Sequence, residues 1–148
     1  MKILDLKESN LTADELIALM TLVGNELPEP LSMRVDIPAY LEKITNNGEC
    51  YILIDSKQGP AGFIGFYTND KKNRKAYLSI ISILPHFQGK GYGKKLMELM
   101  ISKCVEMGMI DISLEVQSTN IKAINCYKKF GFNNVAIKAD KIVMCKNI

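Results

Sequence analysis

Three glycines at alternate positions, Gly89, Gly91 and Gly93, separate an apolar segment from a lysine-rich one in this 148-residue chain. The preceding residues, 76–84, are typical of a β-strand, and residues 91–108 have the apolar spacing of an amphipathic helix. A helix amino terminus presents unpaired backbone NH groups and the positive end of the helix dipole, a combination that binds phosphate. Because glycine has no side chain, the backbone here can approach an anion closely. The stretch therefore predicts an anion site built mainly from backbone.

The positive charge around this turn comes from Lys90, Lys94 and Lys95. A P-loop would need glycine in place of Gln88 and a serine or threonine in place of Lys95, so the chain has no P-loop here. The dinucleotide fingerprint GxGxxG also fails, because its third glycine is missing. A glycine-rich turn that binds nothing is the alternative.

The bulk composition places the chain among soluble globular proteins of one domain. It is 47% hydrophobic and 24% charged, which is ordinary for that class. A net charge of +3 does not by itself indicate a nucleic-acid partner. No apolar run approaches ~18 residues, so we expect no membrane span. The opening residues, MKILDLKESN, have no signal-peptide core, and we expect a cytoplasmic location.

Charge is distributed unevenly along the chain. Residues 8–49 hold eight acidic and two basic residues, whereas residues 50–148 hold fifteen basic and seven acidic residues. One interpretation is ordinary surface variation. The other is that the two parts face ligands of opposite charge, the basic part a phosphorylated ligand and the acidic part a cation.

The cysteines and the single histidine do not form a metal-binding pattern. The four cysteines have no CxxC spacing, and His86 is the only histidine, so we expect no metal site. Separated cysteines in a cytoplasmic chain are most often reduced core residues. A catalytic cysteine that uses His86 as its base is the alternative.

Hydrophobic periodicity and turn residues predict a mixed α/β fold. Thr12 and Glu15 form a capping box at the start of a predicted helix, and prolines over 28–38 interrupt the pattern that follows. In the third predicted helix the expected apolar side is Leu96, Leu99, Met100, Lys103 and Met107. Helices are predicted over 11–27, 39–48, 91–108 and 120–131. Strands are predicted over 50–56, 61–69, 76–84 and 110–116, with one or two more over 135–146. This order predicts a mixed sheet in one layered domain.

Two sequence blocks resemble the GNAT superfamily of N-acetyltransferases. The first is Gln88-x-x-Gly91-x-Gly93 after Ile81-x-Ile83-x-Pro85, which resembles that superfamily's acetyl-CoA signature. The second resembles its closing block and consists of Asn120, Ala123, Tyr127, Gly131 and Phe132. The two blocks cover residues 76–132 in the expected order, whereas the first 48 residues carry no such resemblance.

The resemblance implies a single GNAT-like domain over 1–148, with a mostly antiparallel, splayed central sheet flanked by helices. The gap between strands 76–84 and 110–116 would admit the pantetheine arm of acetyl-CoA, a co-substrate, without a metal. Backbone groups of two isoleucines would pair with the pantetheine amides, and backbone NH groups of the glycine turn would hold the pyrophosphate. The implied cofactor-binding residues are Ile81, Ile83, Gln88, Gly89, Lys90, Gly91, Tyr92, Gly93, Lys94 and Asn120.

The resemblance also implies two catalytic residues. Tyr127 would lie beside the coenzyme A sulfur and protonate the leaving thiolate; the alternative is a core tyrosine on an apolar stripe. Glu115 lies twelve residues earlier in a predicted strand, as in enzymes that acetylate the N-termini of ribosomal proteins, and would be the general base. The alternative for Glu115 is a hydrogen-bonded structural carboxylate. Asn120 is also a predicted helix cap.

The sequence thus predicts transfer of acetyl from acetyl-CoA to a primary amine in one ternary complex. The acceptor would be a small molecule or a protein N-terminus, and the acidic part of the chain favours a cationic acceptor. One alternative is a coenzyme A-binding module without catalysis. Another is nucleic-acid binding through Lys71, Lys72, Arg74 and Lys75, although no aromatic residue lies within that loop. We expect no nucleic-acid or membrane partner, and the resemblance makes a homodimer an open expectation.

Overall fold

The computed structural model describes residues 1–25 and 31–148. The carboxyl end of the helix predicted over 11–27, and the first part of the proline segment 28–38, lie outside the described residues. In the described part of the chain, no helix is long and apolar enough to cross a membrane.

Seven strands form one sheet in the order β1-β2-β3-β4-β5-β7-β6. All neighbouring strands are antiparallel except β4 and β5, which run parallel. The strands are β1 (Lys2–Asp5), β2 (Glu49–Asp55), β3 (Gly59–Asp70), β4 (Lys75–Ile83), β5 (Asp111–Gln117), β6 (Asn133–Lys138) and β7 (Lys141–Asn147). The predicted single domain with a mostly antiparallel sheet is confirmed, and residues 135–146 form the β6–β7 hairpin.

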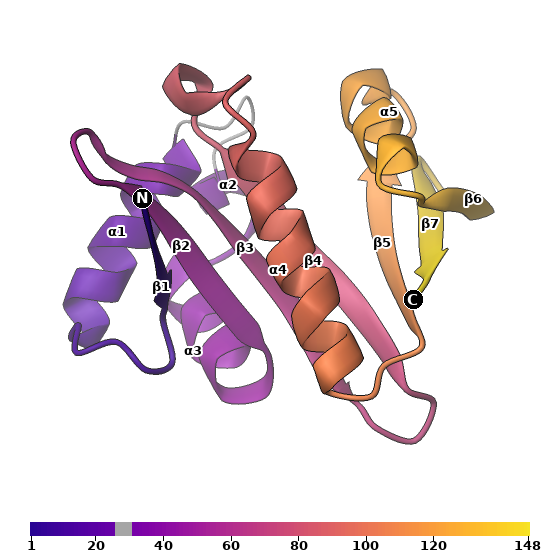
Figure 1. Ribbon diagram of the computed structural model, residues 1–148, viewed down its shortest axis with the longest axis horizontal. Helices are drawn as coiled ribbons and strands as arrows, with labels where there is room; N and C mark the ends of the chain where they lie inside the picture. The colour runs from indigo at the N-terminus through magenta and orange to yellow at the C-terminus, as the bar shows by residue number, and fades with distance from the viewer. Residues whose placement is uncertain (26–30) are drawn as a thin grey trace.

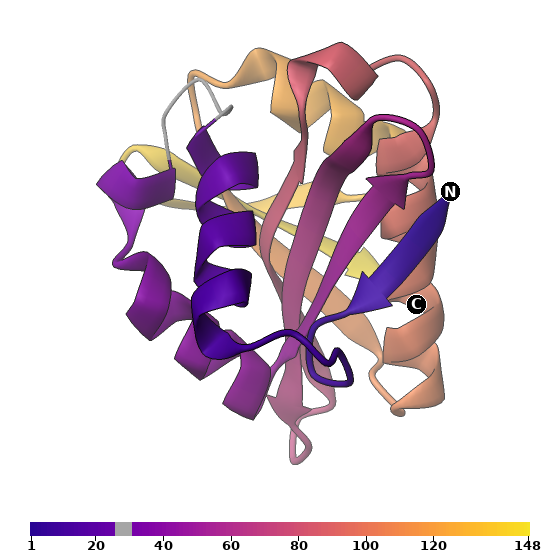
Figure 2. The ribbon, with the colours of Figure 1, turned by 90° about the vertical axis from the view of Figure 1, so that its left-hand side faces the viewer.

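Helices cover both faces of the sheet. They are α1 (Ala13–Asn25), α2 (Leu31–Arg34), α3 (Ile37–Asn47), α4 (Tyr92–Glu106) and α5 (Ile121–Lys129), with a 3₁₀ turn at Pro85–Phe87. Figure 2 shows α1 and α3 on one face and α4 on the other. In Figure 1, α5 lies over β5 and β7 at the far end of the sheet. A separate buried apolar cluster lies on each face.

The predicted helix caps are present. Thr12 Oγ1 accepts from the Glu15 backbone NH at 3.2 Å, and Glu15 Oε1 accepts from the Thr12 NH at 3.3 Å, which is the expected capping box. Asn120 Oδ1 accepts from the Ala123 NH at 3.2 Å and begins α5. This cap fixes where α5 starts, and so the position of Tyr127 two turns later.

Two sequence predictions need correction. The strand β1 was not predicted; it is only four residues long and exists because it pairs with β2. The buried side of α4 is Leu96, Met97, Met100 and Cys104. Lys103 and Met107, which we expected on that side, are exposed in part, so the predicted stripe was rotated away from the true one.

The central irregularity of the sheet lies between β4 and β5. These strands pair only from Lys75–Tyr77 to Asp111–Ser113 and then separate, as Figure 1 shows. On its other side β4 stays paired with β3, but the register shifts so that Gly65 pairs with Ile80 and Phe66 with Leu78. Ser79 is therefore an extra residue, a bulge of the kind that bends a strand. The sheet is splayed at this position, as predicted.

Candidate active site

A cavity of about 690 Å³ fills the gap between the separated strands. Its size lies within the range of small-molecule and cofactor sites, ~300–1,000 Å³. The residues that line it come from β4, β5, α5, α2 and β7; they include Ser79, Ile81, Glu115, Asn120, Tyr127, Arg34 and Lys141. Four predicted site residues, Ile81, Glu115, Asn120 and Tyr127, therefore share one cavity. Ile83 is not among its lining residues and packs against the core on the α4 side.

The glycine turn precedes α4 at one end of this gap. Gly89 and Gly91 have positive φ angles of 80° and 83°, which glycine adopts without strain. The first α-helical bond runs from the Lys95 NH to the Gly91 carbonyl. Among the described residues, the backbone NH groups from Gly89 to Lys94 have no acceptor, so the predicted anion donors are available. Gln88 was also predicted to bind the cofactor, but its NH is not free, because it donates to the Pro85 carbonyl at 3.3 Å.

Side chains hold the turn against its neighbours. The Tyr92 hydroxyl donates to Asp55 Oδ2 at 2.8 Å, which ties the start of α4 to the β2–β3 turn. Gln88 Nε2 donates to the Ile83 carbonyl at 3.1 Å. Lys122 of α5 reaches Gln88 Oε1 from across the gap over a long 3.5 Å.

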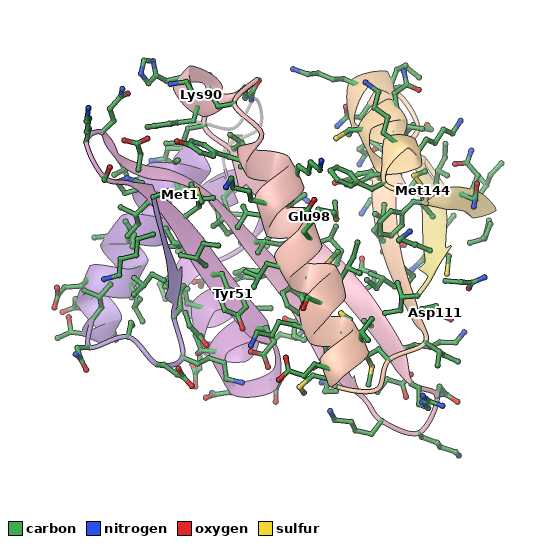
Figure 3. All side chains as sticks on the ribbon, in the orientation of Figure 1. Met1, Tyr51, Lys90, Glu98, Asp111 and Met144 are labelled. Carbon is green, nitrogen blue, oxygen red and sulfur yellow. The ribbon has the colours of Figure 1, made fainter. Side chains whose placement is uncertain are left out.

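Two lysines of the turn contact other side chains. Lys90 Nζ lies 5.6 Å from the centre of the Phe87 ring, and Lys94 forms an exposed pair with Glu98 at 3.9 Å. Figure 3 shows Lys90 at the open end of the splayed region and Asp111 where β5 begins, at its closed end. Both lysines therefore add positive charge at the end where the unpaired NH groups lie.

Tyr127 lies on α5 with its ring edge against Phe132, at 6.0 Å between ring centroids. Its burial raises the pKa of the phenol to about 12, and the positive charge of Arg34 acts against this rise. Tyr127 is thus both a core residue and a wall of the cavity. It is a weaker acid than its ordinary pKa of ~10 suggests.

Glu115 uses both of its carboxylate oxygens. Oε1 pairs with Lys138 Nζ at 3.2 Å, and Oε2 accepts from the Tyr77 hydroxyl at 3.1 Å. The hydrogen bond from Lys138 is the main reason that the pKa of Glu115 lies below its usual value, and the bond from Tyr77 adds to it. The neighbours Leu114 and Val116 are buried in the core on the α4 side, as their alternation predicted. Glu115 is therefore an ionised carboxylate on the opposite face of the sheet.

No sequence pattern indicates that Tyr77, Lys138 or Arg34 belongs to this site. Tyr77 and Lys138 are far from Glu115 in sequence and meet it only in the folded chain. Ser79, at the bulge, bonds to the Tyr40 hydroxyl at 3.0 Å, which joins α3 to β4. Arg34 belongs to a proline-interrupted segment with no recognisable motif.

The charges around the cavity differ from the sequence expectation. Its charged lining residues are Arg34, Glu115 and Lys141. Of the acidic residues in 8–49 that the structure describes, none lines this cavity. Glu8 and Glu49 instead line a separate hollow beside β1 and the end of α4. The expected acidic wall is therefore absent from the described lining; Glu26 and Glu29 lie outside the described residues.

In this structure a parallel strand pair separates around a cavity, and a glycine turn with unpaired NH groups lies at the open end. This arrangement is typical of the acetyl-CoA-binding acyltransferase folds that the sequence resembles. Residues 16–132 match the sequence profile of the Acetyltransferase (GNAT) family. This match covers well over half of the chain, and the chain belongs to that family.

Individual relatives differ in what they acetylate. The spermine/spermidine N(1)-acetyltransferase of Bacillus subtilis is 36% identical over 72 residues, 48% of this chain and 47% of that protein. The ribosomal protein bS18-alanine N-acetyltransferase of Haemophilus influenzae is 38% identical over 96 residues, 63% of this chain and 62% of that protein. The chain thus matches about half of the first relative's length and less than two thirds of the second's.

The fold has close structural neighbours at low sequence identity. The crystal structure of the ribosomal-protein-S18-alanine N-acetyltransferase from Escherichia coli superimposes with a TM-score of 0.76 at 20% identity. The superposition covers 99% of this chain and 94% of that one. This likeness confirms the fold over essentially the whole chain.

Proposed function

We propose that this chain transfers the acetyl group of acetyl-CoA to a primary amine by direct attack in a ternary complex. The observation that carries the proposal is the separation of β4 and β5 after Tyr77 and Ser113 around a cavity of about 690 Å³. A proton donor, Tyr127, and a carboxylate, Glu115, line that same cavity. The two residues that we propose as acid and base therefore line one cavity, which supports the proposal.

The cofactor would bind along β4 and across the glycine turn. Beyond Tyr77, β4 has no strand partner on its β5 side among the described residues, so the Ile81 backbone is open to a pantetheine amide. The Ile83 carbonyl already accepts from Gln88 Nε2 and would have to exchange that bond for one to the cofactor. The unpaired NH groups of Gly89 to Lys94 would hold the pyrophosphate, with charge from Lys90 and Lys94. The Asn120 side chain caps α5 and lines the cavity, so it would serve as both cap and cofactor contact.

The acceptor amine must lose a proton to attack. An amine with a pKa of ~10.4 is neutral in only about one molecule in 2,500 at pH 7, and a positioned base contributes ~10²–10⁴-fold. Glu115 would receive this proton. Lys138 occupies Oε1 of Glu115 and lowers the pKa of this carboxylate, which makes it a weaker base. The acceptor amine would therefore first have to replace Lys138 at Oε1.

Tyr127 would protonate the leaving sulfur. In the reaction the new nitrogen–carbon bond forms as the carbon–sulfur bond breaks, and the phenol proton passes to the thiolate. A phenol with a pKa of about 12 is a poor donor to an ordinary thiolate of ~8.5. Burial also raises the pKa of a thiol, as it does for Cys104 in the core, so a desolvated coenzyme A thiolate would accept a proton from Tyr127 more readily than a solvated one.

Two relatives suggest two acceptor classes that the proposed chemistry could serve. One relative is named for spermine and spermidine, and the other for the alanine N-terminus of a ribosomal protein. Both are primary amines, so the proposed chemistry fits either.

The first test is calorimetric titration of the purified chain with acetyl-CoA, with ADP as a control. We expect micromolar binding of acetyl-CoA and much weaker binding of ADP, because ADP lacks the pantetheine arm. No binding at millimolar acetyl-CoA would overturn the proposal.

The second test is thiol release with a panel of amines. Tyr127→Phe should lower kcat by about 10²–10⁴-fold while acetyl-CoA still binds, and Glu115→Gln should lower it when the amine is protonated. Tyr51→Phe is the matched control, because Tyr51 lies away from the cavity. Binding without turnover on any amine would instead identify a coenzyme A-binding module.

A further inference from the structure

The described lining of the cavity carries two basic residues, Arg34 and Lys141, and one acidic residue, Glu115. Glu115 is already paired with Lys138, so its charge is largely balanced. Arg34 and Lys141 also line the cavity, and neither takes part in an ion pair within the described part of the chain. Among the described residues, two cations therefore line the cavity without an ion pair, although the charge of Lys141 also acts on Glu115.

Arg34 lines the cavity together with residues of β4, β5 and α5. Burial raises the pKa of Tyr40, Tyr77 and Tyr127, and the positive charge of Arg34 acts against the rise in all three. These phenols belong to three different elements, α3, β4 and α5. The Arg34 side chain is nevertheless exposed, so a ligand that enters the cavity can reach it.

We propose that the acceptor carries a carboxylate close to its primary amine, and that Arg34 binds this carboxylate. The inference rests on the proposed acetyl transfer and names the acceptor class for the same site. A guanidinium binds carboxylate in a planar, two-bonded geometry that neither an ammonium nor an amide reproduces. The acceptor ammonium takes the place of Lys138 at Glu115, and Lys141 adds positive charge beside Arg34.

A polyamine fits this site poorly. Its additional ammonium groups would meet Arg34 and Lys141, and like charges in a partly desolvated cavity repel. The carboxylate can come from two sources: the α-carboxylate of a free amino acid, or an acidic side chain near the N-terminus of a peptide. Both sources present the same pair of groups, an amine and a carboxylate.

The test measures acceptor binding by calorimetry to the chain saturated with coenzyme A. Three matched comparisons are made: L-alanine with L-alaninamide, the peptide Ala-Asp-Ala-Ala-amide with Ala-Lys-Ala-Ala-amide, and each of these with spermine. We expect at least one carboxylate-bearing ligand to bind about tenfold or more tightly than its matched partner and than spermine. The amino acid pair and the peptide pair identify the source of the carboxylate.

Arg34 variants then assign the preference to a residue. In Arg34→Met the preference should fall to about twofold or less, and Arg34→Lys should retain part of it, because charge remains but the planar geometry is lost. Lys129→Met is the control for a lost surface charge; Lys129 is exposed on α5, does not line the cavity, and should leave the preference unchanged.

Three outcomes decide between the ideas. Spermine binding as tightly as the carboxylate ligands, or a preference that survives in Arg34→Met, overturns the carboxylate inference and leaves acetyl transfer intact. A preference that depends on Arg34 without thiol release from acetyl-CoA for any of these amines overturns the proposed function alone. Binding preference and acetylation of the same ligand support both.

Discussion

The Tyr77 hydroxyl donates to the Glu115 carboxylate over 3.1 Å and so joins β4 to β5 just where the two strands separate. Ladder pairing ends at Tyr77 and Ser113, and Glu115 lies two residues further along β5. This side-chain bond therefore continues the contact between the strands after backbone pairing has stopped. It also orients the carboxylate that we propose as the base.

Replacing Tyr77 by phenylalanine tests this relationship. Tyr77→Phe leaves the ring in place and removes the donor, so the free energy of unfolding should fall by about 1 kcal/mol. Denaturant unfolding of the variant measures this change. Tyr67→Phe is the matched control, since its hydroxyl has no hydrogen-bond partner among the described residues. Equal losses in the two variants would mean that the Tyr77 bond contributes nothing specific.

Lys138 should control the ionisation of Glu115. The Lys138 hydrogen bond is the largest cause of the lowered pKa, so Lys138→Met should move the pKa of Glu115 up toward its ordinary value. A ¹³C-detected titration of the Glu115 carboxyl carbon measures this directly. Lys129→Met, on the exposed side of α5, should leave the titration unchanged.

The same variant has a consequence for stability. A carboxylate whose folded pKa is lowered contributes stability above its unfolded pKa and loses it as pH falls through the folded pKa. Lys138→Met should therefore flatten the decline of unfolding free energy between neutral and acidic pH. An unchanged slope together with an unchanged Glu115 titration would contradict the ion pair.

Two glycines of the anion turn should respond differently to alanine. Gly91 has a φ of 83°, where a side chain costs about 1–2 kcal/mol, although a Cβ there would meet no neighbour. Gly93 lies within α4 at ordinary helical φ, and its Cβ would make only an ordinary 3.7 Å contact with Ile83. Gly91→Ala should therefore distort the turn and weaken acetyl-CoA binding about tenfold, whereas Gly93→Ala should fold normally.

Calorimetry on this pair separates backbone strain from close approach of the ligand. If Gly93→Ala folds like the parent but loses acetyl-CoA affinity, the cofactor requires bare backbone at that position. If Gly91→Ala binds as tightly as the parent, the turn conformation is not the binding conformation.

Local patterns in the sequence were enough to predict most elements of the fold. The capping box at Thr12 and the cap at Asn120 predicted where α1 and α5 begin, because these bonds link residues three apart. The strand β1 could not be predicted in this way. Its four residues gain their structure only from pairing with β2, some fifty residues later.

The residues of the candidate site show the same difference between local patterns and long-range contacts. Tyr127 and Glu115 could be selected because they lie near motifs of a known family. Tyr77, Lys138 and Arg34 could not, since each acts through contacts or charge between elements far apart in sequence. The prediction of which side of α4 is buried was also wrong. Lys103 fits the helical spacing, but its charged end remains in solvent.

Replacing either partner of the contact between Asp55 and Tyr92 should change cofactor affinity, and the two replacements should act in opposite directions. Tyr92→Phe removes the 2.8 Å bond that ties α4 to the β2–β3 turn, so the glycine turn should be less ordered and acetyl-CoA should bind a few-fold more weakly. Asp55→Asn removes a negative charge, and asparagine retains an acceptor oxygen for the backbone NH groups of Lys57 and Gln58.

Backbone hydrogen bonds in that turn are the largest cause of the lowered pKa of Asp55, so it is ionised at neutral pH, close to the proposed pyrophosphate site. Asp55→Asn should therefore strengthen acetyl-CoA binding, and the gain should shrink at 0.5 M salt because the effect is electrostatic. The loss in Tyr92→Phe should depend little on salt. Calorimetric affinities at low and high salt measure both, and a shift in the same direction for the two variants would contradict the separation of charge from position.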